Sequence, residues 1–242
     1  MTLTLYPAID LKNGQCVRLL RGDMDKATVF AEKPSEQAKT FETAGFKWLH
    51  LVDLNGAIEG RPVNAEAVAS IRKTVSMPIQ LGGGIRTIEQ ISYWLEAGIT
   101  RVILGTVALK NPALVNEACK LFPGTIAVGI DARGGKVAVE GWVETSEVKA
   151  TDLAKSFEDS GVSAIIYTDI GRDGALMGPN IDETLALAQA VRIPIILSGG
   201  VSSIRDVENI NAVAAQGISG AIIGRALYER TILPEEALRI AS

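Results

Sequence analysis

The sequence predicts one α/β domain over residues 1–242, folded as a (β/α)8 barrel built from two repeated half-barrels. Three observations support this prediction. Short apolar runs alternate with helical patterns, four motifs recur in the same order in the second half, and no linker or composition break divides the chain. A length of 242 residues also suits a single barrel of this kind.

Eight short apolar runs are the predicted strands. Each is too short for a helix, and most are rich in Ile, Val and Leu, as parallel strands buried on both faces are. The segments between them carry apolar residues at three- and four-residue spacing, which is typical of helices. The runs are LYPAI (5–9), KWLHLV (47–52), PIQL (78–81), RVIL (101–104), TIAVGI (125–130), SAIIY (163–167), PIIL (194–197) and GAIIG (220–224).

An internal repeat favours a closed barrel over an open sheet. Four motifs return 116 to 121 residues later in the same order, so that two four-strand halves make eight strands. Eight parallel strands close naturally into a TIM-type barrel. The pairs are PAIDLKNG (7–14) with VGIDARGG (128–135), LVDLNG (51–56) with YTDIGRDG (167–174), PIQLGGGI (78–85) with PIILSGGV (194–201), and RVILGTVAL (101–109) with GAIIGRALY (220–228).

Helix starts are marked by capping residues. Thr87 with Gln90, and Asn180 with Glu183, resemble capping boxes, in which two side chains each accept a backbone N–H at the start of a helix. Both pairs directly precede helical patterns, so we expect helices to begin there.

Composition and charge exclude several classes of function. Hydrophobic residues make up 47% of the chain, and the net charge is −4 with no basic block, so no nucleic-acid groove is predicted. No apolar run reaches the ~18–20 residues of a membrane span, and the first residues do not resemble a signal peptide. Cys16 and Cys119 are far apart and outside any CxxC pattern, which predicts neither a disulfide framework nor a zinc site. We expect a cytoplasmic protein without a membrane partner.

Two carboxylates are the candidate acid and base. Asp10 ends the first predicted strand and Asp131 the fifth, at equivalent positions of the repeat. These strands lie opposite each other in an eight-stranded ring, and active sites of such barrels lie at the carboxyl ends of the strands. The simpler alternative is that each Asp caps a turn. The paired positions favour the catalytic interpretation.

Glycines at four strand ends predict two phosphate sites. Glycine lets backbone N–H groups approach an anion closely, and the turns after the seventh and eighth strands often bind phosphate in this fold. The same pattern follows the third and fourth strands, so the expected ligand carries two phosphates. Tight turns are the simpler alternative. The residues are Gly83, Gly84, Gly105 and Thr106 in the first half, and Gly199, Gly200, Gly224 and Arg225 in the second.

Three further residues are weaker candidates. Arg18 lies with Arg21, Gly22 and Asp23 in a long first loop, which is either a lid over substrate or a solvated charged loop. His50, the only histidine, cannot build a multi-histidine metal site and is either a buried structural residue or a substrate contact. Trp142 follows the fifth strand in a short predicted hairpin, where it would stack on a base-like ring or cover the barrel rim.

The motifs resemble those of the histidine-biosynthesis barrels, and most closely the ProFAR isomerase family, along essentially the whole chain. That resemblance implies an aldose–ketose isomerase that performs an Amadori rearrangement of a bisphosphorylated substrate, without a metal or other cofactor. It implies Asp10 as general base and Asp131 as general acid, assisted by Thr168 and Asp169. The motifs are PAIDLKNGQCVRLLRGD (7–23), LHLVDLNGA (49–57), QLGGGIR (80–86), VGIDARGGKVAVEGW (128–142), TDIGRDG (168–174), SGGVSS (198–203) and GRALYE (224–229).

Three alternatives stay open. The cyclase of the same pathway shares the half-barrel pattern and both carboxylates, but the first motif and the EGW segment resemble the isomerase. A bifunctional isomerase that also serves tryptophan synthesis typically has an arginine-rich stretch where this chain has AVEGWVE (138–144). A non-catalytic phosphate-binding barrel would not need both carboxylates. We expect a monomer that binds a small molecule and no nucleic acid.

Overall fold

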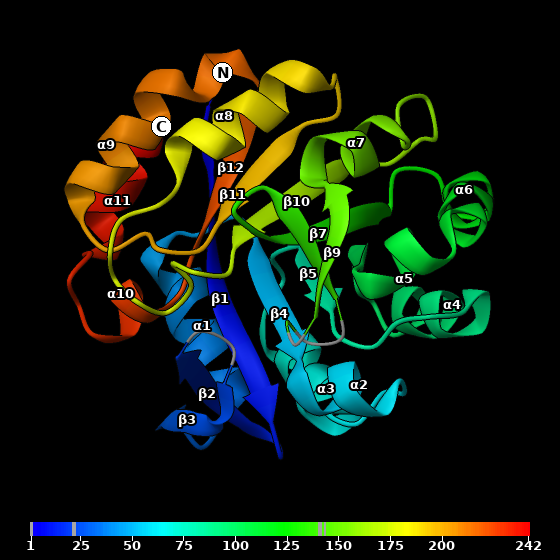
Figure 1. Cartoon of the computed structure of the whole chain (residues 1–242). Coiled ribbons are helices and arrows are strands. Elements are labelled where there is room, and N and C mark those ends of the chain that lie inside the picture. Colours follow the sequence, from blue (N-terminus) through cyan, green and yellow to red (C-terminus); the bar gives the residue numbers. More distant parts are fainter. Residues whose placement is uncertain (1, 21–22, 140–141, 143) are drawn as a thin grey trace.

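The computed structural model describes residues 2–20, 23–139, 142 and 144–242. Eight parallel strands form a closed ring, because β1 pairs with both β4 and β12, and β7 pairs with both β6 and β10 (Figure 1). The predicted (β/α)8 fold is therefore confirmed. The barrel strands are β1 (Thr4–Lys12), β4 (Leu49–Asp53), β5 (Ile79–Gly82), β6 (Arg101–Leu104), β7 (Ile126–Arg133), β10 (Ala164–Asp169), β11 (Ile195–Ser198) and β12 (Ile218–Ile223).

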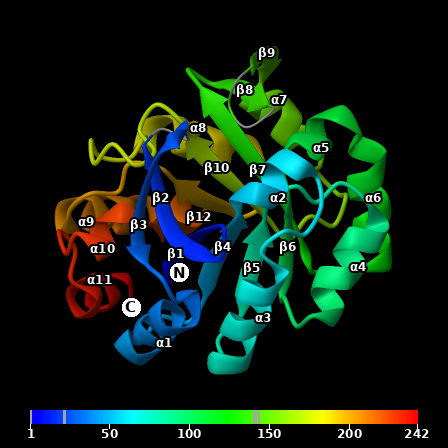
Figure 2. The same cartoon turned by 90° about the horizontal axis from the view of Figure 1, so that it is seen from below.

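Helices surround this ring on the outside (Figures 1 and 2). In the described ranges, none of them has the length and apolar character needed to cross a membrane. They are α1 (Pro34–Ala44), α2 (Leu54–Glu59), α3 (Ala65–Thr74), α4 (Ile88–Glu96), α5 (Thr106–Lys110), α6 (Pro112–Leu121), α7 (Ala150–Lys155), α8 (Ile181–Ala190), α9 (Ile204–Val213), α10 (Arg225–Tyr228) and α11 (Pro234–Ala241), with a 3-10 turn at Ala214–Gln216.

Two apolar layers hold the barrel together. The larger layer lies between strands and helices, and the smaller one fills the barrel interior. Alternation along each strand divides the residues between the layers, so that Ile165 packs outward and Ile166 inward. The inner layer consists of Tyr6, Ala8, Ile103, Ala127, Ala164, Ile166, Ile196 and Ile222, with Trp48 packed against it.

Antiparallel strands follow β1 and β7, the two opposite strands of the ring. After β1 come β2 (Gln15–Leu20) and β3 (Asp23–Ala31), and after β7 come β8 (Lys136–Val139) and β9 (Glu144–Lys149). The hairpin predicted after the fifth strand is confirmed. The first loop, predicted without regular structure, is instead strand-paired over its described residues.

The predicted capping boxes are only half formed. Thr87 and Asn180 each accept the backbone N–H three residues on, as expected. The reciprocal bonds are not made, because Gln90 accepts a backbone N–H that precedes the helix and Glu183 accepts the Tyr167 hydroxyl. The helices begin where predicted, but the second side chain of each pair connects neighbouring elements instead.

The repeat is also visible in hydrogen bonds remote from the carboxyl ends of the strands. Glu42 accepts the backbone N–H of Ser76 at 2.6 Å, and Glu158 accepts that of Arg192 at 2.6 Å. The two bonds occupy equivalent positions, 116 residues apart. Each connects the end of one helical segment to the loop before the third strand of its half. This brace is therefore a stability feature that both halves share.

We expect Glu42→Gln to lower the melting temperature at pH 7 by about 2–4 °C, or ~1 kcal/mol in a protein of this size. Hydrogen bonds from Lys39 and then from Ser76 lower the pKa of Glu42 from 4.5 to about 2. The stabilisation is therefore complete above about pH 4.5 and is lost as the pH falls towards 2. Melts at pH 7 and pH 3, with the exposed Glu117→Gln as control, test this; an equal deficit at both pH values would contradict it.

Candidate active site

Asp10 and Asp131 face the barrel mouth from opposite strands. Asp10 lies near the carboxyl end of β1 and Asp131 near that of β7, and four strand pairings separate them in either direction around the ring. Both side chains are partly buried. The opposed arrangement that the repeat predicted is therefore present, and the two positions are not equivalent in their surroundings.

An arginine from β2 pairs with Asp10. Arg18 Nη1 lies 2.8 Å from Asp10 Oδ2, and the side chains are only 11% and 17% exposed. The guanidinium also donates to the Ala8 carbonyl and lies over the Tyr228 ring, 5.0 Å from its centroid. A solvated loop is therefore the wrong interpretation for Arg18. Arg21 and Gly22, which belong to the same predicted loop, lie outside the described residues.

Asp131 is held by two hydrogen-bond donors. Trp142 Nε1 donates to Asp131 Oδ2 at 2.8 Å, and Thr168, its register neighbour on β10, donates as well. Burial raises the pKa of Asp131 above its usual value, and these two hydrogen bonds partly oppose that rise. The indole of Trp142 therefore faces the site instead of covering the outer rim, and Thr168 lies where the resemblance implied.

A third carboxylate, Asp173, was missed by sequence reasoning. It follows β10, and its pKa is raised from 3.8 to about 7 by burial and then by the negative charges of Asp10 and Asp131, against the lowering effect of Arg18. Both opposed carboxylates therefore act on it electrostatically. The available indication was a departure from the repeat, since the equivalent residue in the first half is Ala57.

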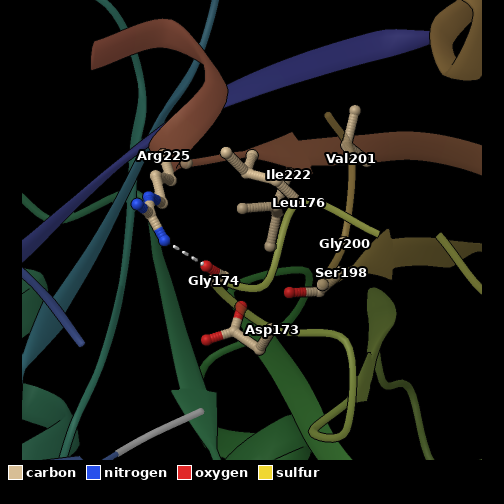
Figure 3. Close-up of a pocket in the computed structure, with 10 residues that line it drawn as sticks. Asp173, Gly174, Leu176, Ser198, Gly200, Val201, Ile222 and Arg225 are labelled. Carbon is tan, nitrogen blue, oxygen red and sulfur yellow. Dashed lines mark hydrogen bonds between the residues drawn. The ribbon is translucent and has the colours of Figure 1, made fainter. Parts of the chain in front are cut away.

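A small pocket of about 30 Å³ opens beside Asp173. It lies between the ends of β11 and β12 and the loop after β10, and Figure 3 shows the side chains of Asp173, Ser198 and Leu176 around it. Arg225 Nη1 donates to the Gly174 carbonyl at 2.9 Å across the pocket. Four residues predicted for the second phosphate site line this pocket: Gly199, Gly200, Gly224 and Arg225.

The paired glycines after β5 and β11 are required by backbone packing. A Cβ on Gly84 would lie 1.8 Å from the Gly56 carbonyl oxygen, and one on Gly200 would lie 2.4 Å from that of Gly178. A side chain at Gly200 would therefore disrupt the fold, so its effect on ligand binding is no clean test of a phosphate site. Positive φ angles also favour glycine at Gly83, Gly84, Gly199 and Gly200, where φ is 115°, 72°, 91° and 86°.

The glycines after β6 and β12 differ from these pairs. Gly105 and Gly224 precede α5 and α10 with closely similar backbone angles, φ −92° with ψ −111° and φ −103° with ψ −106°. A Cβ on Gly105 would meet nothing within 4 Å, whereas one on Gly224 would approach the Arg18 guanidinium at 3.0 Å. Thr106 and Arg225 are the first residues of these short helices. The open side of Gly105 is therefore available to a ligand.

We expect Gly105→Ala to raise KM about 10-fold with little change in kcat or melting temperature, because its methyl group enters the open space expected for a phosphate oxygen. Gly84→Ala is the contrasting variant. Its methyl group collides with backbone, so we expect loss of folded protein instead of weaker binding. Steady-state kinetics and thermal melts measure both. An unchanged KM in Gly105→Ala would remove the first predicted phosphate site.

Asp169 belongs to a structural hydrogen-bond network, and His50 lies below the carboxylates. Asp169 accepts from the Gly171 N–H at 2.9 Å and from Asn180 Nδ2 at 2.7 Å, which secures the loop that carries Asp173. Asp53, its equivalent in the first half, secures its own loop through Asn64 in the same way. His50 lies deeper in the barrel than the carboxylates and is 9% exposed.

The fold and site together define a class of barrel enzyme with repeated halves, opposed carboxylates and glycine turns at the mouth. Comparison with known proteins places the chain within this class. The model of the family described as "Histidine biosynthesis protein" matches residues 4–233. The chain belongs to this family.

Close relatives match along almost their whole length. A protein from Acidiphilium cryptum is 61% identical over 244 residues, covering 100% of this chain and 99% of the relative. One from a Chelativorans species is 62% identical over 236 residues, with 98% and 97% covered. One from Parvibaculum lavamentivorans is 60% identical over 238 residues, with 98% of each covered. All three are named as a phosphoribosyl-imidazole-4-carboxamide isomerase.

Proposed function

We propose that this protein is the aldose–ketose isomerase of histidine biosynthesis that converts ProFAR to PRFAR. The observation that carries the proposal is the full-length identity of about 60% to isomerases so named, combined with a mouth that brings three carboxylates together. The reaction moves protons within one molecule and changes no net oxidation state. Acid and base side chains are therefore sufficient in principle, and no cofactor is proposed.

In this proposal Asp10 is the base. An acid first opens the aminoaldose ring and leaves an iminium, which acidifies the proton on C2′. Asp10 then takes that proton, and the resulting enolamine becomes the ketose when C1′ takes up a proton and the hydroxyl on C2′ gives one up. The Arg18 guanidinium at 2.8 Å keeps the Asp10 carboxylate oriented at the mouth. A general base of this kind contributes roughly 10²–10⁴-fold to a rate.

Two carboxylates are candidates for the general acid, Asp131 and Asp173. The resemblance implies Asp131 as the general acid, and burial raises its pKa. Trp142 and Thr168, however, both donate hydrogen bonds to Asp131 and so stabilise its charged form. Asp173 has a pKa of about 7, close to what a general acid needs at neutral pH. We propose that Asp173 donates the ring-opening proton and that Asp131, with Thr168, orients the substrate.

The two ends of the substrate carry its phosphates. We propose that one phosphate binds at Gly199, Gly224 and Arg225, where the pocket lies, and the other at Gly105 and Thr106. These turns are equivalent in the repeat and follow strands on opposite sides of the ring. Asp10 and Asp131 would then lie near the middle of an extended bisphosphate. Opening of the 170–180 loop would admit the phosphate to the small pocket.

Remaining contacts and properties follow the same proposal. Trp142 would stack on the imidazole ring while its Nε1 donates to Asp131, and His50 would lie below the sugar. We also propose a monomer in a reducing, cytoplasmic compartment, supported by Cys16 and Cys119, which are both free and buried.

The test is turnover of purified protein with ProFAR, followed by absorbance or by separation of aldose and ketose. Phosphoribosylanthranilate is the second substrate in the same assay. We expect turnover of ProFAR only, because the relatives carry the name of a single isomerase activity and the 138–144 segment has no arginine-rich stretch. Turnover of phosphoribosylanthranilate would restore the bifunctional alternative, and no turnover of ProFAR would reject the proposal.

A further inference from the structure

A row of polar side chains crosses the barrel interior below the active site. His50 on β4, Gln80 on β5 and Arg101 on β6 are neighbours in strand register and are 9%, 0% and 9% exposed. His50 is paired with Ala8, whereas Asp10 is paired with Val52. The row therefore lies one inward-facing position deeper than the catalytic base.

The second half of the barrel has no such row. Its equivalent residues are Ile166, Ile196 and Gly220, and the two isoleucines belong to the apolar inner layer. A half-barrel of this repeat therefore closes without polar residues at these positions. Burying an arginine without a carboxylate partner is costly, and in the described part of the chain Arg101 has none. The polar row thus calls for an explanation other than stability.

Hydrogen bonds along the row can run in only one direction. A guanidinium only donates, so the Gln80 amide atom that faces Arg101 Nε at 3.1 Å is its oxygen. The amide NH2 of Gln80 must then face His50, where it lies 3.0 Å from Nδ1. Since that NH2 is a donor, Nδ1 is an acceptor and carries no proton. The neutral ring must therefore carry its proton on Nε2.

Aromatic side chains fix the arginine that sets this direction. Arg101 Nη2 lies 3.1 Å from the Tyr6 hydroxyl, and its guanidinium lies 4.7 Å from the centroid of the Trp48 ring and 5.8 Å from that of Tyr6. These contacts favour a cation at this position without neutralising it. Arg101 therefore stays charged and keeps its donors aimed at Gln80.

The ring that results is a neutral donor. Among the described residues, His50 Nε2 has no hydrogen-bond partner. The charged groups acting on the ring are Arg18, which pairs with Asp10 at the mouth, and Arg101 in the same row. Burial and then these two positive charges lower the pKa of His50 to about 3. Protonation would place an imidazolium near Asp10, stabilise that carboxylate and weaken it as a base.

We propose that Gln80 and Arg101 are positioning residues that fix His50 as the Nε2–H tautomer, so that its ring donates a neutral hydrogen bond to a sugar oxygen of the substrate. The donor side of the inference rests on the proposed isomerase function, whereas the tautomer does not. The polar row then serves catalysis: it supplies a donor below the base without adding a charge there.

The tautomer is directly measurable because the chain contains one histidine. Protein labelled with 15N in histidine, and prepared without a histidine tag, gives one imidazole spectrum. We expect Nε2, which couples to both ring protons, to carry the hydrogen from about pH 5 to about pH 9. A ring that carries its proton on Nδ1, or that becomes doubly protonated near pH 6.5, would overturn the proposal that Gln80 and Arg101 fix the Nε2–H tautomer.

Gln80→Glu is the decisive variant. The introduced carboxylate pairs with Arg101 and accepts from Nδ1, so Nδ1 should gain a proton, as the Nδ1–H tautomer or as imidazolium. We expect kcat to fall at least ~10-fold with a smaller change in KM. Ile196→Val is the matched control in the other half, with the tautomer and kcat unchanged. If His50 in this variant keeps its proton on Nε2 alone, the proposal that Gln80 fixes the tautomer is rejected.

Arg101→Met is the second variant, for the case in which Gln80→Glu does not fold. Without a fixed donor the Gln80 amide can turn over, so both His50 tautomers should appear. A single Nε2–H species would overturn the assignment of Arg101. The outcomes separate cleanly from the proposed function. If His50 is the Nε2–H tautomer but the protein does not turn over ProFAR, the proposed isomerase function is rejected. If the enzyme is active but His50 is the Nδ1–H tautomer, the positioning role of Gln80 and Arg101 is rejected.

Discussion

Asp10→Asn is expected to reduce kcat by at least ~10³-fold while the substrate still binds. Asparagine keeps the shape of the side chain and one oxygen that can accept from Arg18, so the mouth should keep its form. It cannot take a proton from C2′, because a neutral amide is a very weak base. The loss should therefore appear in kcat, with KM or the dissociation constant within a few-fold of the original.

The measurement is single-turnover kinetics together with equilibrium binding of ProFAR by Asp10→Asn. Glu117→Gln, an exposed carboxylate on α6, is the matched control and should keep full activity. A melting curve shows whether the loss of the partly buried ion pair with Arg18 has unfolded the variant. Folded Asp10→Asn with turnover close to that of the original enzyme would refute the base assignment.

The repeat is what made the fold predictable from sequence. Parallel strands buried on both faces appear as short apolar runs, and the return of four motifs identified eight strands in two halves. The same argument placed Asp10 opposite Asp131, because ring geometry follows from strand order alone. The opposed placement of these two carboxylates was therefore predictable from the sequence.

The contacts of residues that depend on loop conformation could not be predicted from the sequence. For Arg18 the sequence leaves a lid and a solvated charged loop equally open, and only the pairing of β2 with β1 shows that Arg18 contacts Asp10. The glycines after β5 and β11 are predicted to bind phosphate, and the structure adds a second reason for glycine there, because a Cβ would collide with neighbouring backbone. Local sequence cannot reveal which neighbouring loop a backbone atom touches, so these contacts appear only in the folded structure.

Departures from the repeat proved as informative as the repeat itself. Asp173 stands where the first half has Ala57, and His50 and Gln80 stand where the second half has isoleucines. A shared position is sufficiently explained by the common architecture. A polar residue present in only one half has no such explanation, and these departures gather at or below the mouth. We therefore propose that function has modified the repeated scaffold at these positions.

Asp173→Asn is expected to lower kcat/KM by about 10²–10⁴-fold and to change its pH dependence. A general acid must hold its proton, and the pKa of Asp173 is about 7. In the original enzyme, kcat/KM should therefore fall as the pH rises through about 7, because the protonated form is lost. The variant has no such group, so its residual activity should lack that alkaline limb. If Asp131 is the acid instead, Asp131→Asn should lose the limb and Asp173→Asn should retain it.

Stability gives an independent check on the same carboxylate. A folded-state pKa raised from 3.8 to about 7 means that the folded protein is progressively destabilised, relative to its low-pH form, as the pH rises through this range. Asparagine avoids that cost. The melting temperature of Asp173→Asn should therefore exceed that of the original protein by a few degrees at about pH 8, and the gain should shrink towards pH 4. If Asp173→Asn is both less active and more stable at high pH, the charge of Asp173 is kept for function at a cost in stability. If the gain in melting temperature does not depend on pH, Asp173 titrates normally and cannot be the acid.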